Sequence, residues 1–227
     1  MGQIFLIRHG QAAFGELDYD ALTPLGEQQA RETGRHLKGS ALPIERVVTG
    51  EMKRQKQSAS QALDAMESLL HPQVDAAFNE FDHLGVIAAA HPLILKGTPE
   101  LIQAMEENFS NRTFQPFFAK AVDLWVQGRL TCESYKAFTH RVLEGLHRMA
   151  MNLGKGESVA LFTSGGAISV MAASAMGLDL DKALGLSWTL RNGSITTLIK
   201  GKKGLSLLDF GCAGHLAASD PGLLTFR

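Results

Sequence analysis

The chain has 227 residues, enough for one or two domains with a sizeable buried core. Its 22 basic and 23 acidic residues nearly cancel, which argues against binding of the whole chain to nucleic acid or to an anionic membrane surface. No apolar run reaches the roughly 18 residues of a membrane span, and the N-terminus has no signal-peptide pattern. Cys132 and Cys212 lie far apart without metal-ligand spacing, so we expect free thiols and a cytoplasmic protein.

The first third of the sequence alternates between strand and helix patterns. The apolar run over 3–7 predicts a buried strand. Thr23 is a typical helix cap and Pro24 a typical first helical residue, which predicts a helix that runs to about Lys38. The pattern then predicts a strand over 45–49, a helix over 51–66 and a short strand over 74–78.

The middle of the sequence loses the strand pattern. From about 79 to 131 the apolar residues fall at helical or irregular spacing, which indicates a helical insertion. A long helix over about 133–153, a strand over 157–163, a helix over 167–176 and a hairpin with strands over 195–200 and 205–210 complete the chain.

This order of elements predicts the fold class. Strands that alternate with helices give a mostly parallel sheet between two helical layers, a three-layer α/β fold, and the hairpin adds an antiparallel edge. We therefore expect one domain over 1–227, with a small helical cap inserted at about 80–132.

Reactive side chains follow three of the predicted strands. Arg8 and His9 end the first strand, Arg54 lies in the first turn after the second, and Ser164-Gly165 follows the strand over 157–163. The carboxyl ends of the strands in an open α/β sheet share one edge, where ligands bind. Two guanidinium groups beside a glycine-rich helix start are suited to a phosphate group.

At these residues the sequence resembles the histidine phosphatase superfamily, the phosphoglycerate-mutase-like group. Arg8-His9-Gly10 resembles the nucleophile motif of that family. The other matching segments keep the family's order along the chain: Leu22–Ala30, Gly50–Ala59, Asn79–Asp82, Phe162–Gly166, Arg191–Ile195 and Gly214–Leu216.

The resemblance implies hydrolysis of phosphomonoesters through a phosphohistidine. In that chemistry His9 attacks phosphorus, Glu80 protonates the leaving oxygen, and Arg8 and Arg54 bind the phosphoryl oxygens. Ser164 and Gly165 would complete the phosphate pocket, and Asp82 is the alternative acid. No metal and no cofactor are expected, and the implied partner is a phosphorylated small molecule; whether the chain forms a homodimer is left open.

One departure from the family pattern bears on activity. Ser164 stands where most members carry a second catalytic histidine, and Gly50 stands where a serine is usual. Loss of a charged donor to the phosphoryl group typically lowers the rate by roughly 10²–10³-fold. Neither His83 nor His215 is assigned to replace it from sequence.

Two alternatives therefore accompany the phosphatase hypothesis. The first is a phosphomutase, although the predicted cap has few basic residues for a doubly anionic substrate. The second is a catalytically weak or inactive protein that binds a phosphorylated ligand. Retention of both His9 and Glu80 argues against the second, because a binding pocket needs neither a nucleophile nor an acid.

Overall fold

The computed structural model describes residues 1–13, 20–40 and 43–226. The chain divides into two compact units. The first comprises Met1–Glu80 together with Arg141–Arg227, and the second comprises Phe81–His140.

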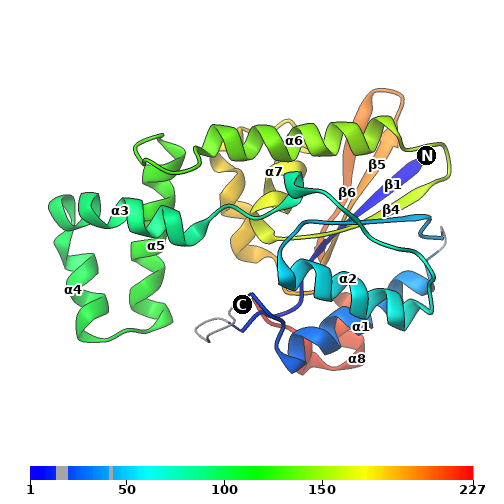
Figure 1. Cartoon of the computed structure of the whole chain (residues 1–227), viewed down its shortest axis with the longest axis horizontal. Helices are drawn as coiled ribbons and strands as arrows, with labels where there is room; N and C mark the ends of the chain where they lie inside the picture. The colour runs from blue at the N-terminus through cyan, green and yellow to red at the C-terminus, as the bar shows by residue number, and fades with distance from the viewer. Residues whose placement is uncertain (14–19, 41–42, 227) are drawn as a thin grey trace. The chain divides into compact units, whose positions relative to one another are not determined.

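The first unit is built on a six-stranded sheet of order β3-β2-β4-β1-β5-β6 (Figure 1). Strands β1 to β4 run parallel, whereas β5 is antiparallel to β1 and β6 is antiparallel to β5. This arrangement confirms the predicted α/β fold with a closing hairpin. The strands are β1 (Gly2–Arg8), β2 (Arg46–Thr49), β3 (Gln73–Val74), β4 (Ser158–Thr163), β5 (Ile195–Gly201) and β6 (Gly204–Cys212).

Helices flank this sheet because its strands are apolar on both faces. Phe5 and Ile7 of β1 pack into one cluster with residues of α1 (Pro24–Lys38) and α2 (Lys53–Met66), such as Leu37 and Ala59. Helix α7 (Gly165–Met176) lies on the other side of the sheet from α1 and α2 in Figure 1. Helix α6 (Tyr135–Met151) leads into β4, and α8 (Gly214–Ser219) packs on α1.

Local capping explains where two elements begin and end. Thr23 accepts a hydrogen bond from the Gly26 N–H at 3.0 Å and so caps α1 as the sequence indicated. The predicted strand over 74–78 is wrong beyond Val74. The Asp75 carboxylate accepts from the Ala77 N–H at 2.9 Å, and this local bond closes a 3₁₀ turn over Ala76–Phe78 in place of a strand ladder.

The second unit is helical, as the loss of the strand pattern predicted. Its helices are α3 (His83–Gly97), α4 (Pro99–Glu107) and α5 (Asn111–Val126), and α3 packs on both others. Asp82 caps α3 by accepting from the Gly85 N–H at 2.9 Å. The role of this segment as a substrate-selecting cap stays a prediction. Two further 3₁₀ helices, which the sequence did not indicate, span Leu180–Thr189 and Pro221–Leu223 in the first unit.

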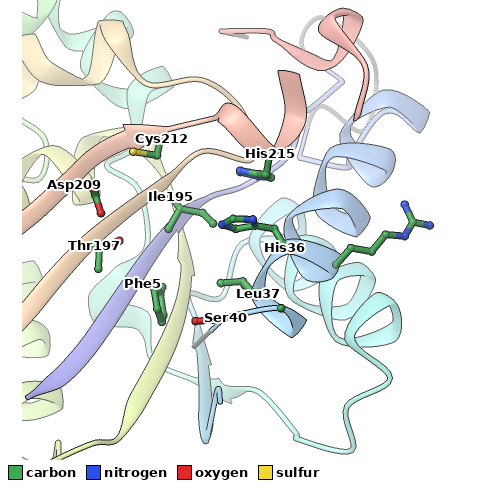
Figure 2. Close-up of a pocket in the computed structure, with 11 residues that line it drawn as sticks. Phe5, His36, Leu37, Ser40, Ile195, Thr197, Asp209, Cys212 and His215 are labelled. Atoms are coloured by element: carbon green, nitrogen blue, oxygen red, sulfur yellow. The ribbon is translucent and has the colours of Figure 1, made fainter. Parts of the chain in front are cut away.

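A buried contact between α1 and α8 supports the end of β1. The Thr33 hydroxyl lies 3.0 Å from the Gly193 carbonyl and 3.2 Å from Nε2 of His215. The Gly193 N–H in turn donates to the Arg8 carbonyl at 3.1 Å. The His215 ring also stacks on His36, with centroids 4.8 Å apart, and both imidazoles line a pocket of about 450 Å³ (Figure 2).

This contact predicts a loss of stability in acid. Burial, and next the neighbouring His36, lower the pKa of His215 from 6.5 to about 4. Between these values the unfolded chain binds a proton that the folded chain does not, so the free energy of unfolding decreases as the pH falls from 6.5 to 4. Because the ring is partly exposed, we expect this group to contribute roughly 1–2 kcal/mol.

The expected outcome is that His215→Gln reduces the dependence of stability on pH in that window, as measured by urea unfolding at several pH values. His147→Gln, on the exposed face of α6, is the control and should leave the dependence as in the wild type. An unchanged dependence in His215→Gln would contradict the assignment.

Candidate functional site

His9 lies one residue past β1, at the edge of the sheet where the parallel strands end. Its N–H donates to the Thr163 carbonyl at 2.9 Å, which extends the pairing of β1 with β4. Its carbonyl accepts from Asn192 Nδ2 at 3.3 Å and from the Gly193 N–H at 3.3 Å. The side chain is only 7% exposed, so backbone and ring are both held in place.

The hydrogen bonds of the His9 ring determine which nitrogen carries the proton. Nδ1 lies 2.7 Å from the Gly10 carbonyl, which can only accept, so Nδ1 is the protonated nitrogen. Nε2 then presents a lone pair, and it accepts from Arg54 Nε at 3.2 Å. Burial, followed by the charges of Arg54 and Arg8, holds the pKa of His9 well below its usual range. The ring is therefore a neutral nucleophile or base.

Arg54 reaches His9 from the first turn of α2 and is almost fully buried. Its Nη1 forms an ion pair with Asp20, whose second oxygen accepts from the Lys53 N–H at 2.7 Å. The Ser58 hydroxyl donates to the Arg54 carbonyl at 2.7 Å and accepts from the Gly10 N–H at 3.0 Å. The ion pair and these hydrogen bonds join α2 to the His9 loop. Sequence reasoning missed Asp20 and Ser58, although Ser58 stands one helical turn after Arg54.

Arg8 and the start of α7 also come together at this edge. Arg8 donates from Nη1 to the Leu190 carbonyl. A Cβ added at Gly165 would lie 3.7 Å from Arg8 Nε, so the guanidinium is beside the first residue of α7. The N–H groups of the first helical turn have no partner within the helix, and their dipoles favour an anion. The two predicted phosphate-binding elements are thus neighbours.

Ser164 is buried between β4 and α7, and it does not cap the helix that it precedes. Its Oγ accepts from Gln55 Nε2 at 2.9 Å. Gln55 follows Arg54 in α2 and is completely buried. Sequence reasoning missed this glutamine as well; a long polar residue on the buried face of α2 was the available signal.

Glu80 contributes a carboxylate at the same place. Its Oε2 accepts from the Gly166 N–H at 2.8 Å, in the first turn of α7. A Cβ at residue 166 would lie 2.3 Å from Glu80 Oε1, so glycine is needed there for this approach. Arg141 of α6, which the sequence did not indicate, donates to the Ala77 and Asn79 carbonyls at 3.0 and 2.8 Å and to the Glu80 carbonyl at 3.3 Å. It thereby holds the segment that carries Glu80.

Comparison with known families decides the classification. The profile of the histidine phosphatase superfamily, branch 1, matches residues 4–212. The chain belongs to this superfamily. No curated protein sequence matches it significantly.

Solved structures share the fold at low sequence identity. YhfR of Bacillus stearothermophilus superposes with a TM-score of 0.68 at 17% identity, covering 95% of this chain and 100% of that one. A phosphoglycerate mutase of Bacillus anthracis gives 0.64 at 16% identity and covers 95% of each chain. A phosphoserine phosphatase of Entamoeba histolytica gives 0.60 at 19% identity, covering 95% and 100%. A phosphoglycerate mutase and a phosphoserine phosphatase therefore share the fold of this chain.

Other residues considered from sequence have structural contacts of their own. Asp82 caps α3 and His83 begins that helix, in the second unit. His215 contacts Thr33 and His36, in the pocket of Figure 2, which none of the predicted site residues lines. In the described part of the chain, no three His, Cys, Asp or Glu side chains are grouped so that they could hold a metal ion, and no helix is long and apolar enough to cross a membrane. Both cysteines are free.

The electrostatics of His9 give a test of the site. Arg54→Met removes one of the charges that disfavour the imidazolium, so we expect the pKa of His9 to rise toward its usual range, while burial keeps it lowered. Imidazole ¹⁵N shifts measured across a pH titration report both the pKa and the Nδ1–H tautomer. Arg31→Met, which breaks an exposed ion pair on α1, is the control and should leave the titration unchanged. A doubly protonated His9 ring in the wild type at pH 6 would contradict the neutral tautomer assigned to it.

Proposed function

We propose that this protein is a phosphatase that hydrolyses phosphomonoesters through a phosphohistidine on His9. One observation carries the proposal: the Nε2 lone pair of a neutral, buried imidazole faces the Arg54 guanidinium. A guanidinium is a poor permanent partner for a lone pair but a good one for phosphoryl oxygens. When a phosphomonoester binds, Arg54 turns to the oxygens and Nε2 is left facing phosphorus.

In the first step, Nε2 attacks phosphorus and the bond from phosphorus to the ester oxygen breaks. Glu80 gives its proton to the departing oxygen, so the alcohol leaves neutral. The equatorial oxygens are bound by Arg8, Arg54 and the N–H groups at the start of α7. The Nδ1–H bond to the Gly10 carbonyl keeps the ring oriented while Nε2 becomes bonded to phosphorus.

In the second step, water attacks the phosphohistidine. Glu80, now a carboxylate, takes the proton of the water as the P–N bond breaks, and inorganic phosphate leaves with His9 neutral again. Protons and electron pairs balance over the two steps. The chemistry uses side chains that the first unit holds at one sheet edge, and it calls for no metal or cofactor.

Ser164 has the place that the family resemblance assigns to a second histidine. It is neutral and shorter than imidazole, so it provides one hydrogen-bond donor without a charge. We propose that it still binds the phosphoryl group together with Gly165, and that turnover is slower than with an imidazolium by up to roughly 10²–10³-fold. Cytoplasmic location and a phosphorylated small molecule as substrate remain part of this proposal.

A panel of phosphomonoesters separates the candidate functions. The panel includes phosphoglycerates, sugar phosphates, nucleotides and phosphoproteins. Release of inorganic phosphate supports the phosphatase, isomerised phosphoglycerate without release supports the mutase, and binding without any turnover supports the inactive alternative.

A covalent intermediate is the expected result for His9. Rapid quenching without acid, followed by mass spectrometry, should show a gain of roughly 80 Da on the peptide that contains His9, the mass of one phosphoryl group. His9→Ala should lower kcat by on the order of 10⁴-fold or more, since loss of a nucleophile removes the covalent route. His147→Ala, on the exposed face of α6, serves as the matched control. Unchanged turnover in His9→Ala would refute the proposal.

A further inference from the structure

We infer that Gln55 is a positioning residue, which turns the Ser164 hydroxyl proton toward the bound phosphoryl group. The inference rests on the proposed function and assigns a role to a residue for which neither the sequence motifs nor the comparisons give one. Its basis is the hydrogen bonding of two side chains that are 0% and 1% exposed.

The orientation of the Gln55 carboxamide follows from its partners. Nε2 lies 3.2 Å from the Phe78 carbonyl and 2.9 Å from Ser164 Oγ. A carbonyl oxygen only accepts, so the amide nitrogen has to be on this side. Both N–H groups are then used, one on Phe78 and one on Ser164. On the other side, Oε1 accepts from the Met52 N–H at 3.4 Å.

This arrangement decides what the Ser164 hydroxyl can do. A hydroxyl has one proton to donate, and here its oxygen already accepts from Gln55. Its own proton has no acceptor in the part of the chain that the structure describes. A buried donor without an acceptor is costly, and a ligand oxygen would satisfy it.

The usual acceptor role of a serine at this position has been taken over by another residue. A serine that precedes a helix normally accepts from an N–H of the first turn. Here Glu80 accepts the Gly166 N–H, and the Ser164 side chain makes no such bond. Ser164 is thereby released from helix capping.

Ser164 also stands level with His9. Residues Arg8 and Thr163 are paired in the parallel strands β1 and β4, so the next residues, His9 and Ser164, leave the sheet side by side. The His9 N–H donates to the Thr163 carbonyl at 2.9 Å, so the backbones remain joined at this point. Ser164 and His9 therefore follow adjacent strands at the carboxyl edge of the sheet, where the proposed phosphoryl group binds.

Gly50 makes room for this pair. A Cβ at residue 50 would lie 2.0 Å from Gln55 Oε1 and 2.9 Å from Asn79 Oδ1. Any larger residue there would displace the carboxamide from its place against Ser164. Gly50, Gln55 and Ser164 are therefore one packed set, and the absence of a side chain at residue 50 is a condition for the hydrogen bond.

A double-mutant cycle on the full-length protein tests the inference, with p-nitrophenyl phosphate as substrate and inorganic phosphate as ligand. Ser164→Ala removes the proposed donor, and we expect kcat/KM to fall by on the order of 10²-fold, mainly in kcat. Gln55→Met keeps the side-chain volume but leaves the hydroxyl unoriented, with an expected loss of roughly tenfold. The double variant should match Ser164→Ala, since without the hydroxyl there is nothing to orient.

Two further variants separate positioning from stability. Ser158→Ala removes the hydrogen bond that another fully buried side chain donates to the Pro43 carbonyl, at the end of β4 opposite Ser164, and should lower the melting temperature without the loss in kcat. Gly50→Ala displaces the Gln55 carboxamide because the added Cβ would overlap Gln55 Oε1. As a single variant it should therefore lower kcat as much as Gln55→Met does, and it should have no effect on kcat when it is added to Ser164→Ala. This variant decides the question if Gln55→Met does not fold.

The outcomes are distinct. Two results overturn the role of Gln55 while leaving the phosphatase proposal intact. The first is losses that multiply in the double variant, and the second is a Gln55→Met variant that, like Ser158→Ala, loses thermal stability without losing kcat. If the wild type hydrolyses no phosphomonoester, the proposed function fails. The inference is then tested by the dissociation constants for inorganic phosphate, and it holds if the double variant binds phosphate as weakly as Ser164→Ala does. A wild type that binds no phosphate overturns both.

Discussion

The hydrogen bond from His9 Nδ1 to the Gly10 carbonyl is the interaction on which the candidate site depends. A buried imidazole can adopt either neutral tautomer, and a carbonyl at 2.7 Å permits only the one with a free Nε2. The peptide that supplies this carbonyl is held by Gln29, whose Oε1 accepts from the Gln11 N–H at 2.8 Å, and the preceding peptide is held by Ser58, whose hydroxyl accepts from the Gly10 N–H. In this tautomer the Nε2 lone pair accepts a hydrogen bond from Arg54 Nε. Burial and the charges of the two guanidiniums lower the pKa of His9, so the ring stays neutral.

The start of α7 shows how one helix end serves several purposes. Its free N–H groups favour negative charge, and Glu80 takes one of them through Gly166. The same bond holds the carboxylate at the edge where His9 lies and leaves the Ser164 side chain without a capping role. Arg141 holds the backbone of the segment that carries Glu80 by donating to the Asn79 and Glu80 carbonyls.

Gly50, Gln55 and Ser164 illustrate why differences from a resembling family cannot be interpreted one position at a time. In the sequence, Gly50 and Ser164 are two separate differences from the resembling family, and nothing connects either of them with Gln55. In the folded chain a missing side chain, a buried amide and a short hydroxyl fill one volume. Dense packing of protein interiors makes such positions interdependent, because a change in one volume has to be met by its neighbours.

The sequence by itself determined the fold class and the order of the elements, because strand and helix periodicities and helix caps such as Thr23 act over a few neighbouring residues. It also placed Arg8, His9, Arg54, Ser164 and Gly165 at strand ends, where a parallel sheet gathers them. It failed at Ala76–Phe78, where an aspartate side chain ended the strand, and it could not find Asp20, Gln55, Ser58 or Arg141. The two groups that the Gln55 amide nitrogen contacts, on Phe78 and Ser164, are 23 and 109 residues away in sequence. Arg141 is 62 residues away from Asn79. Only tertiary structure decided the direction of the Ser164 hydroxyl and the placement of the neighbouring carbonyl that selects the His9 tautomer. The hydroxyl depends on Gln55, which is 109 residues away, and the backbone on either side of the Gly10 carbonyl is held by Ser58 and Gln29, which come from later in the sequence and meet it only in the folded chain.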